Sequence, residues 1–152
     1  MIVYRISKAR HTRDLSGEGA RLNGGRWNHV LTPCVYTSSS RALAVLEFTV
    51  NVNIDDIPGN LCITVIEIPD DSWTEPKLAK LPADWTQSPS PSSTKDFGTK
   101  LLKMADASVL KLPSVVIPQE FNYILNPRHP ESSDFKILDV EELVFDSRIK
   151  RK

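Results

Sequence analysis

The sequence predicts one α+β domain with a mixed sheet of five to seven short strands and two or three helices. Its 152 residues are a usual length for a single domain. Short runs of β-branched and aromatic residues recur along the chain and alternate with stretches of helical character. The composition is ordinary for a globular domain, with 40% hydrophobic and 25% charged residues. No repeat, low-complexity segment or second domain interrupts this order.

The first third of the chain is expected to hold two strands and a helix around a glycine-rich loop. Residues 2–6 and 34–37 are rich in β-branched and aromatic types, which favours strands. Residues 11–28 lack periodicity and carry four of the six glycines, which is typical of a loop. Residues 41–51 follow three serines that can cap a helix. This helix is nearly apolar all round, which predicts that it is buried.

The remaining chain predicts further strands separated by long connections. Residues 61–68 form the clearest strand pattern and are too apolar for a sheet edge. Proline and serine break any period over residues 70–93, apart from a helical turn near 77–80. The other expected elements are a polar turn at 52–60, a helix at 99–107, a strand at 113–118, turns within 121–130 and one or two strands within 135–145.

Charge and cysteine content exclude several classes of protein. Nineteen basic residues balance nineteen acidic ones, which argues against a dedicated nucleic-acid binder. Two cysteines, Cys34 and Cys62, lie in apolar surroundings, where free thiols are expected rather than a disulfide framework. The chain begins with no apolar leader, and no apolar run approaches 18 residues. We therefore expect a cytoplasmic protein that neither enters nor binds a membrane.

The balanced charge is unevenly distributed. Residues 1–30 carry six basic side chains, whereas residues 131–146 carry six acids against one lysine. One interpretation is that the two groups are solvated faces that attract each other. The alternative is that the basic end of the chain receives an anionic ligand.

Glu47 is the most informative single residue. It is the only charged side chain between Ala42 and Val50, and it shares a helical face with Leu43. A carboxylate on a buried helix costs several kcal/mol unless it is paired or hydrogen-bonded. Either this helix has one exposed edge that Glu47 occupies, or the carboxylate lies in a dry cleft where it can stabilise developing positive charge.

A second candidate feature is the run Gly24-Gly25-Arg26-Trp27-Asn28. Paired glycines allow a ligand to approach the backbone, and an arginine can bind phosphate with two parallel hydrogen bonds. A purely structural turn explains the same residues, and the spacing matches neither a P-loop nor a dinucleotide fingerprint. Taken alone, Tyr36 is best interpreted as a core aromatic residue and Ser114 as a serine in a turn. Three scattered histidines give no zinc-ligand spacing.

Taken together, these segments resemble the signature of the RES domain, a family named for its Arg, Glu and Ser residues. The resemblance is carried by GGRWN at 24–28, VYTS at 35–38 and ALAxLE at 42–47. It continues in Tyr4-Arg5 with SGEGAR at 16–21, and in PSVVIPxExNxxxNP at 113–127. No family motif falls between 70 and 94. We assign residues 1–147 to the RES domain and 148–152 to a basic C-terminal tail.

The resemblance implies a fold and an activity. RES domains are similar in fold to ADP-ribosyltransferases, so we expect a strongly bent sheet. They are bacterial toxins neutralised by an Xre-type antitoxin with a helix-turn-helix domain. They destroy NAD⁺ by hydrolysis or phosphorolysis, which makes NAD⁺ a substrate and implies no other cofactor and no metal. Some members are reported to ADP-ribosylate a protein.

Carried over by position, the resemblance implies a set of site residues. Glu47 stabilises the positive charge at the ribose, as carboxylates do in glycoside hydrolysis. Arg26 and, less directly, Arg5 bind the pyrophosphate, while Tyr36 packs on the nicotinamide ring. Ser114 orients either Glu47 or a ribose hydroxyl. The expected catalytic residues are thus Arg26, Tyr36, Glu47 and Ser114, and the substrate-binding residues are Arg5 and Asn28.

Several alternatives stay open at this point. The acceptor of ADP-ribose can be water, phosphate or a protein side chain, and the last makes the chain a protein-modifying enzyme. A non-enzymatic binding module gives these four site residues no reason to occur together. Zero net charge and the lack of a histidine pair disfavour RNA cleavage and direct nucleic-acid binding. A homodimer within a larger complex with the antitoxin is left open.

Overall fold

The computed structural model describes residues 1–53 and 57–150 and shows a seven-stranded mixed sheet. The strand order is β4-β5-β6-β2-β1-β3-β7. Among the described strands, β4 and β5 pair in parallel and the other neighbours pair antiparallel. The strands are β1 (Ile2–Lys8), β2 (Val35–Ser38), β3 (Leu61–Glu67), β4 (Trp73–Thr74), β5 (Val109–Pro113), β6 (Phe121–Leu125) and β7 (Lys136–Leu143). The predicted α+β class is confirmed.

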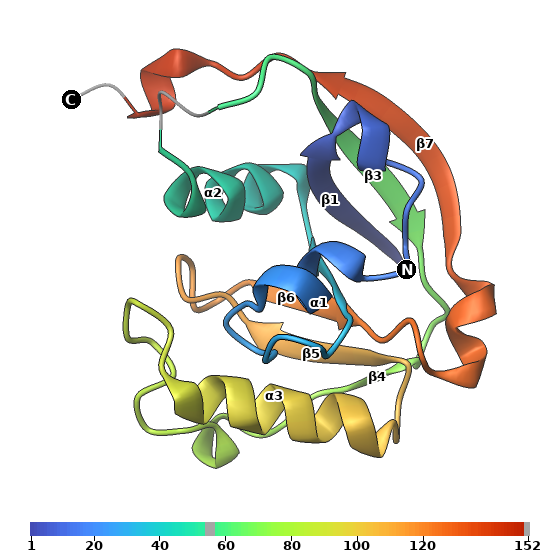
Figure 1. The fold of residues 1–152 in the computed structure, drawn as a ribbon, viewed down its shortest axis with the longest axis vertical. Coiled ribbons are helices and arrows are strands. Elements are labelled where there is room, and N and C mark those ends of the chain that lie inside the picture. Colours follow the sequence, from blue (N-terminus) through green and yellow to red (C-terminus); the bar gives the residue numbers. More distant parts are fainter. Residues whose placement is uncertain (54–56, 151–152) are drawn as a thin grey trace.

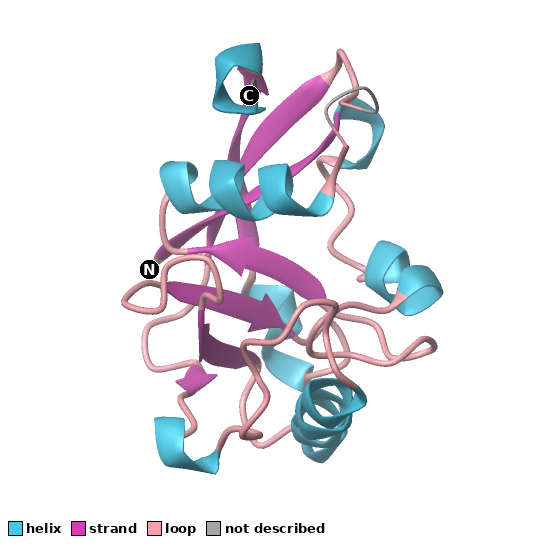
Figure 2. Ribbon diagram, turned by 90° about the vertical axis from the view of Figure 1, so that its left-hand side faces the viewer, coloured by secondary structure: helices cyan, strands magenta, loops and turns pink. Residues whose placement is uncertain are grey.

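Within the described residues, three α-helices accompany the sheet: α1 (Glu18–Asn23), α2 (Arg41–Asn51) and α3 (Ser92–Met104). Helices α2 and α3 lie at different heights along the long axis of the molecule, with α1 between them (Figures 1 and 2). Strands β3 and β7 run along this axis, whereas β5 and β6 cross it, so the sheet turns strongly from edge to edge (Figure 1). Short 3₁₀ turns occur at Ala9–His11, Leu78–Lys80, Pro130–Asp134 and Ser147–Lys150.

Alternating side chains of the central strands build two apolar cores. Val35 of β2 and Leu125 of β6 belong to one cluster, while Ile124 belongs to the other. This alternation is expected where both faces of a strand are covered. The second cluster includes Trp27, against which α3 packs very closely. A Cβ at Gly98 of α3 would lie 2.1 Å from the Trp27 carbonyl oxygen, so only glycine fits there.

Several sequence-based boundaries are wrong. Helix α3 begins at residue 92 rather than 99, because its buried side includes Thr94 and Gly98, which add little to a hydrophobic pattern. It ends before Ala105, which has a left-handed φ of 52°. The predicted strand at 113–118 lies instead at 109–113. Residues 121–125 form a central strand that was not predicted, and the expected turn follows it at 127–128; the predicted loop at 11–28 contains α1.

Helix α2 has the predicted bounds and cap, since the Ser40 side chain accepts a hydrogen bond from the backbone N–H of Leu43. It is not buried on every side, however. Leu46 and Val50 are 36% and 57% exposed, so one apolar edge faces solvent. The expectation of a fully buried helix is wrong because α2 covers the sheet from one side only (Figure 1).

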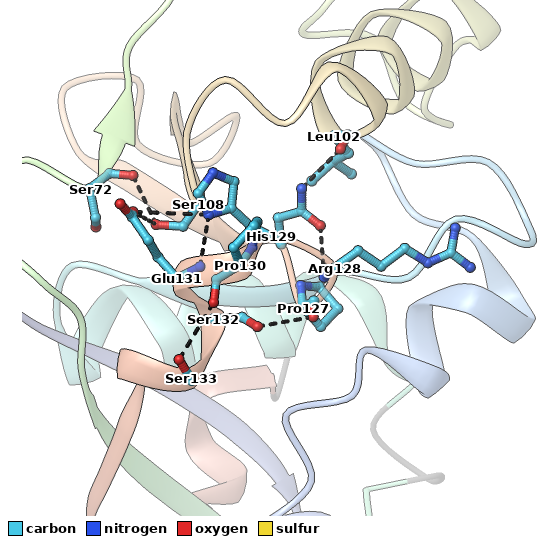
Figure 3. A network of polar contacts seen from close by, with 11 residues as sticks. Ser72, Leu102, Ser108, Pro127, Arg128, His129, Pro130, Glu131, Ser132 and Ser133 are labelled. Atoms are coloured by element: carbon cyan, nitrogen blue, oxygen red, sulfur yellow. Dashed lines mark hydrogen bonds and ion pairs between the residues drawn. The ribbon is translucent and has the colours of Figure 1, made fainter.

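Polar contacts hold the connection between β6 and β7. Asn126 donates from Nδ2 to the Leu102 carbonyl and accepts from the Arg128 N–H, and His129 accepts from the Glu131 N–H at the start of a 3₁₀ turn (Figure 3). Cys34 and Cys62 are both free thiols, as expected; Cys34 is buried, whereas Cys62 is only half-buried. No helix within 1–53 and 57–150 is long and apolar enough to span a bilayer. Parts of the predicted turn and tail, 54–56 and 151–152, lie outside the described residues.

Candidate active site

A cavity of about 900 Å³ opens beside the N-terminal half of the chain. Its walls come from α1 and the glycines that follow it, the C-terminal half of α2, residues 88–90, and residues 113, 115 and 116. A smaller cavity of about 220 Å³ adjoins it between α2 and the sheet, and the two share Arg5, Tyr36, Glu47 and Asn122. The larger volume is in the range of sites for ligands of cofactor size.

Glu47 faces this cavity and is half-buried, so it does not occupy the exposed edge of α2. Its Oε1 atom accepts two hydrogen bonds, one from Ser114 Oγ at 2.7 Å and one from Asn122 Nδ2 at 2.5 Å. Helix α2 therefore meets two residues from the β5–β6 region, 67 and 75 positions later in the sequence, at one carboxylate oxygen. Of the two sequence-based interpretations of Glu47, the structure agrees with the cleft carboxylate.

Ser114 lies behind Glu47 and does not line the cavity. It is fully buried, and its Oγ accepts hydrogen bonds from the backbone N–H groups of Val116 and Ile117, each at 3.0 Å. With both acceptor positions filled, the hydroxyl proton is directed to Glu47. Of the two roles expected for Ser114, the geometry fits orientation of Glu47 and not contact with a ribose hydroxyl.

Arg26 lines the cavity, but part of its guanidinium is already engaged. Its Nη1 donates to the carbonyl oxygens of Trp85 at 2.9 Å and Gln87 at 2.8 Å, which ties residues 85–87 to the cavity wall. Burial lowers the pKa of Arg26, an effect that nearby Glu47 and Tyr36 oppose. Within the described chain its other guanidinium nitrogens form no hydrogen bond, so they are available to an anion.

Arg5 of β1 lines both cavities, and its Nη1 donates to the Asp14 carbonyl oxygen at 2.5 Å. Burial lowers the pKa of Arg5, and the negative charge of Asp14 opposes this shift. No side chain of the basic N-terminal group pairs with an acid from 131–146 among the described residues; Arg21 pairs locally with Glu18. Of the six basic side chains in residues 1–30, Arg5 and Arg26 line the cavity.

The side chains of Tyr36 and Asn28 form a hydrogen bond with each other. Tyr36 Oη donates to Asn28 Oδ1 at 2.8 Å and accepts from the Trp27 N–H at 2.9 Å. Burial raises the pKa of Tyr36 well above its usual value. The hydroxyl is therefore committed to the turn, and only the remainder of the side chain is free to contact a ligand. A Cβ at Gly25 would lie 2.6 Å from this hydroxyl, so the second glycine makes room for Tyr36.

Asn28 does not line the cavity, contrary to the expectation for a substrate-binding residue. It is fully buried, and its Nδ2 donates to the carbonyl oxygens of Ala20 and Thr32, each at 2.9 Å. All its polar atoms hold the turn that carries Arg26, which is a structural role. Asn122 is the converse case: it lines the cavity and contacts Glu47, yet only its place in a family motif pointed to it.

The fold is one that occurs in a toxin–antitoxin complex. A chain in the crystal structure of the M. tuberculosis MbcT–MbcA toxin–antitoxin complex matches with a TM-score of 0.74 at 18% identity, covering 94% of this chain and 84% of that one. At this identity the likeness concerns the fold.

The family follows from the sequence comparisons. The RES domain model matches residues 2–146, and the chain belongs to the RES domain family. It is 38% identical over 91% of its length to the Prs ADP-ribosylating toxin of Sphingobium sp., of which it covers 88%. It is 37% identical over 98% of its length to Toxin Res of Pseudomonas putida, covering 99% of that protein. A Toxin Res of Photorhabdus laumondii is 36% identical over 84% of this chain and 82% of its own length.

Proposed function

We propose that this chain is the toxin of a toxin–antitoxin pair and that it cleaves the nicotinamide–ribose bond of NAD⁺. One observation carries the proposal: the Glu47 carboxylate is held by two hydrogen-bond donors at the wall of a cavity of about 900 Å³ that Arg5 and Arg26 also line. A carboxylate beside two cations in one cavity suits a substrate with a positive reacting centre and an anionic pyrophosphate.

In the proposed reaction, the bond between ribose C1′ and the nicotinamide nitrogen breaks, and its electron pair leaves with nicotinamide. The ribose becomes an oxocarbenium-like cation, which the negative charge of Glu47 stabilises. Arg26 and Arg5 bind the pyrophosphate and hold the ribose at the carboxylate. A water oxygen then bonds to C1′ and loses a proton to solvent, whereas a phosphate oxyanion bonds to C1′ with no proton to lose. Nicotinamide leaves as a neutral ring and needs no acid.

Water and phosphate are the acceptors that we propose first, which makes the enzyme an NAD⁺ glycohydrolase or phosphorylase. A protein acceptor is the second candidate, because a relative with 38% identity is named a Prs ADP-ribosylating toxin. Incubation with NAD⁺ labelled in its adenosine part separates the three. Free ADP-ribose indicates water, ADP-ribose 1″-phosphate indicates phosphate, and label that stays on protein after denaturation indicates protein modification.

We further propose an Xre-type antitoxin with a helix-turn-helix domain as the partner, acting in the cytoplasm. The fold match to a chain from a toxin–antitoxin complex supports the presence of an antitoxin. Its test is co-expression with the product of the adjacent gene, which this proposal expects to encode an Xre-type protein. Restored growth and a co-purifying complex are expected, whereas growth arrest without any complex would contradict this partner.

Expression in bacteria without the antitoxin tests the proposed function as a whole. We expect growth to stop while cellular NAD⁺ falls, and we expect the Glu47→Gln variant to do neither at equal expression. Growth arrest with unchanged NAD⁺ would reject NAD⁺ depletion and favour modification of a protein. Normal growth at high expression of folded protein would reject the toxin assignment.

A further inference from the structure

Glu47 has one constrained and one unconstrained oxygen. Oε1 accepts from Ser114 Oγ and Asn122 Nδ2, whereas Oε2 has no hydrogen-bond partner among the described residues. Two donors on one oxygen fix the rotation of the carboxylate about its terminal bond. Oε2 is therefore the oxygen that can contact a ligand in the cavity. Its direction depends on the two donors that hold Oε1.

The Asn122 amide is hydrogen-bonded at both of its ends. Ser38 Oγ donates to Asn122 Oδ1 at 2.7 Å, which leaves the Nδ2 end to face Glu47. Ser38 is buried, with 4% of its surface exposed, and it lies directly opposite Asn122 in the register of β2 and β6. An ionised Glu47 carboxylate can only accept, so it selects the amide orientation with Nδ2 toward it, and the Ser38 hydroxyl completes this arrangement by donating to Oδ1.

We infer that Asn122 and Ser38 are positioning residues for Glu47. The hydrogen bonds from Ser38 to Asn122 and from Asn122 to Glu47 Oε1 keep Oε2 directed at the ribose position before substrate binds. Preorganised charge needs no rearrangement during the reaction, and this is why it lowers the barrier to the transition state. The inference rests on the proposed NAD⁺ cleavage and adds two residues to its site.

A purely structural role makes a different prediction. If the two side chains only join β2 to β6, their loss should lower stability and leave turnover unchanged. Thr37 provides the matched control for that role. It is buried, precedes Ser38 in the same strand, and donates from Oγ1 to the Tyr123 carbonyl of β6 at 2.6 Å. Neighbouring residues of a strand point to opposite faces, so its hydroxyl does not reach Glu47.

The test is steady-state cleavage of NAD⁺ by Asn122→Asp, Asn122→Ala, Ser38→Ala and Thr37→Val. Asn122→Asp keeps the shape but replaces the donor with an anion, so we expect kcat to fall at least about tenfold, with KM for NAD⁺ within about threefold. Ser38→Ala should lower kcat by about threefold alone and have no further effect in the Asn122→Ala background. Thr37→Val should lower the melting temperature and leave kcat at the wild-type value.

The outcomes separate the inference from the proposed function. Active wild-type protein with kcat unchanged in Asn122→Asp and Asn122→Ala overturns the inference alone. The inference also fails if Thr37→Val loses as much kcat as Ser38→Ala, or if Ser38→Ala and Asn122→Ala act additively. If Asn122→Asp does not fold, Asn122→Ala decides. A folded wild-type protein that leaves NAD⁺ intact overturns the proposed function, and this inference with it.

Discussion

Replacing Glu47 by glutamine removes one negative charge and changes little else. The Oε1 atom of glutamine can still accept from Ser114 and Asn122, and its amide nitrogen takes the place of Oε2. At about 4 Å and an effective dielectric constant of about 20, a unit charge stabilises a cation by about 4 kcal/mol. Because Glu47 is only half-buried, solvent screens part of this, and we expect a loss of about 2.7 kcal/mol, a hundredfold in rate.

The assay combines an initial rate of NAD⁺ cleavage with a thermal melt on the same preparation. We expect Glu47→Gln to be at least about a hundredfold slower, with a melting temperature that is unchanged or raised, since a half-buried charge is gone. Glu142→Gln, the same substitution at an exposed position of β7, is the control and should change neither quantity. Wild-type turnover by Glu47→Gln would refute the catalytic role of this carboxylate.

Three further predictions concern the cavity walls and the core. Arg26→Lys should lower kcat/KM by about 1.5–3 kcal/mol, because an ammonium has three donors and no planar fork, so bonds to the carbonyls of residues 85 and 87 leave it a single donor for phosphate. Near-normal kcat/KM would show that the fork is not needed. Gly25→Ala should lower the free energy of unfolding in urea by about 1–3 kcal/mol, because its Cβ would clash with the Tyr36 hydroxyl. Gly19→Ala is the control and should not lower it, because a Cβ there contacts nothing within 4 Å. Burial raises the pKa of Cys34 to about 12, so iodoacetamide should label Cys62 first in the folded protein. Peptide mass spectrometry measures the two labelling rates, and faster labelling of Cys34 would contradict this prediction. The folded state favours the protonated Cys34 thiol, so its contribution to stability is complete below pH 9.0 and is lost as the pH rises toward about 12.

The sequence predicted those site residues whose type conflicts with their surroundings. Glu47 is a charge within an apolar helix, and Arg26 follows paired glycines, so both are visible without a structure. Arg5 is visible as part of a basic N-terminal group. The structure places all three around one cavity. The cap of α2 was equally predictable, because serine at that position accepts a backbone N–H.

Other features could not be predicted because they depend on contacts distant in sequence. Asn28 and Asn122 are the same residue type within family motifs, yet one donates to three backbone carbonyls and the other donates to Glu47. Only the packing of α1 and the pairing of β2 with β6 distinguish them. The start of α3 differs from the prediction for a related reason: Gly98 is there to admit Trp27, a contact across more than 70 residues, which local helix propensity does not report.

The most direct test of NAD⁺ cleavage is the release of nicotinamide from NAD⁺ by the purified chain, followed over time with water, phosphate and a cell extract supplied as acceptors. We predict release over many turnovers with at least one of these acceptors. Folded protein that releases no nicotinamide with any of the three would contradict the proposed reaction.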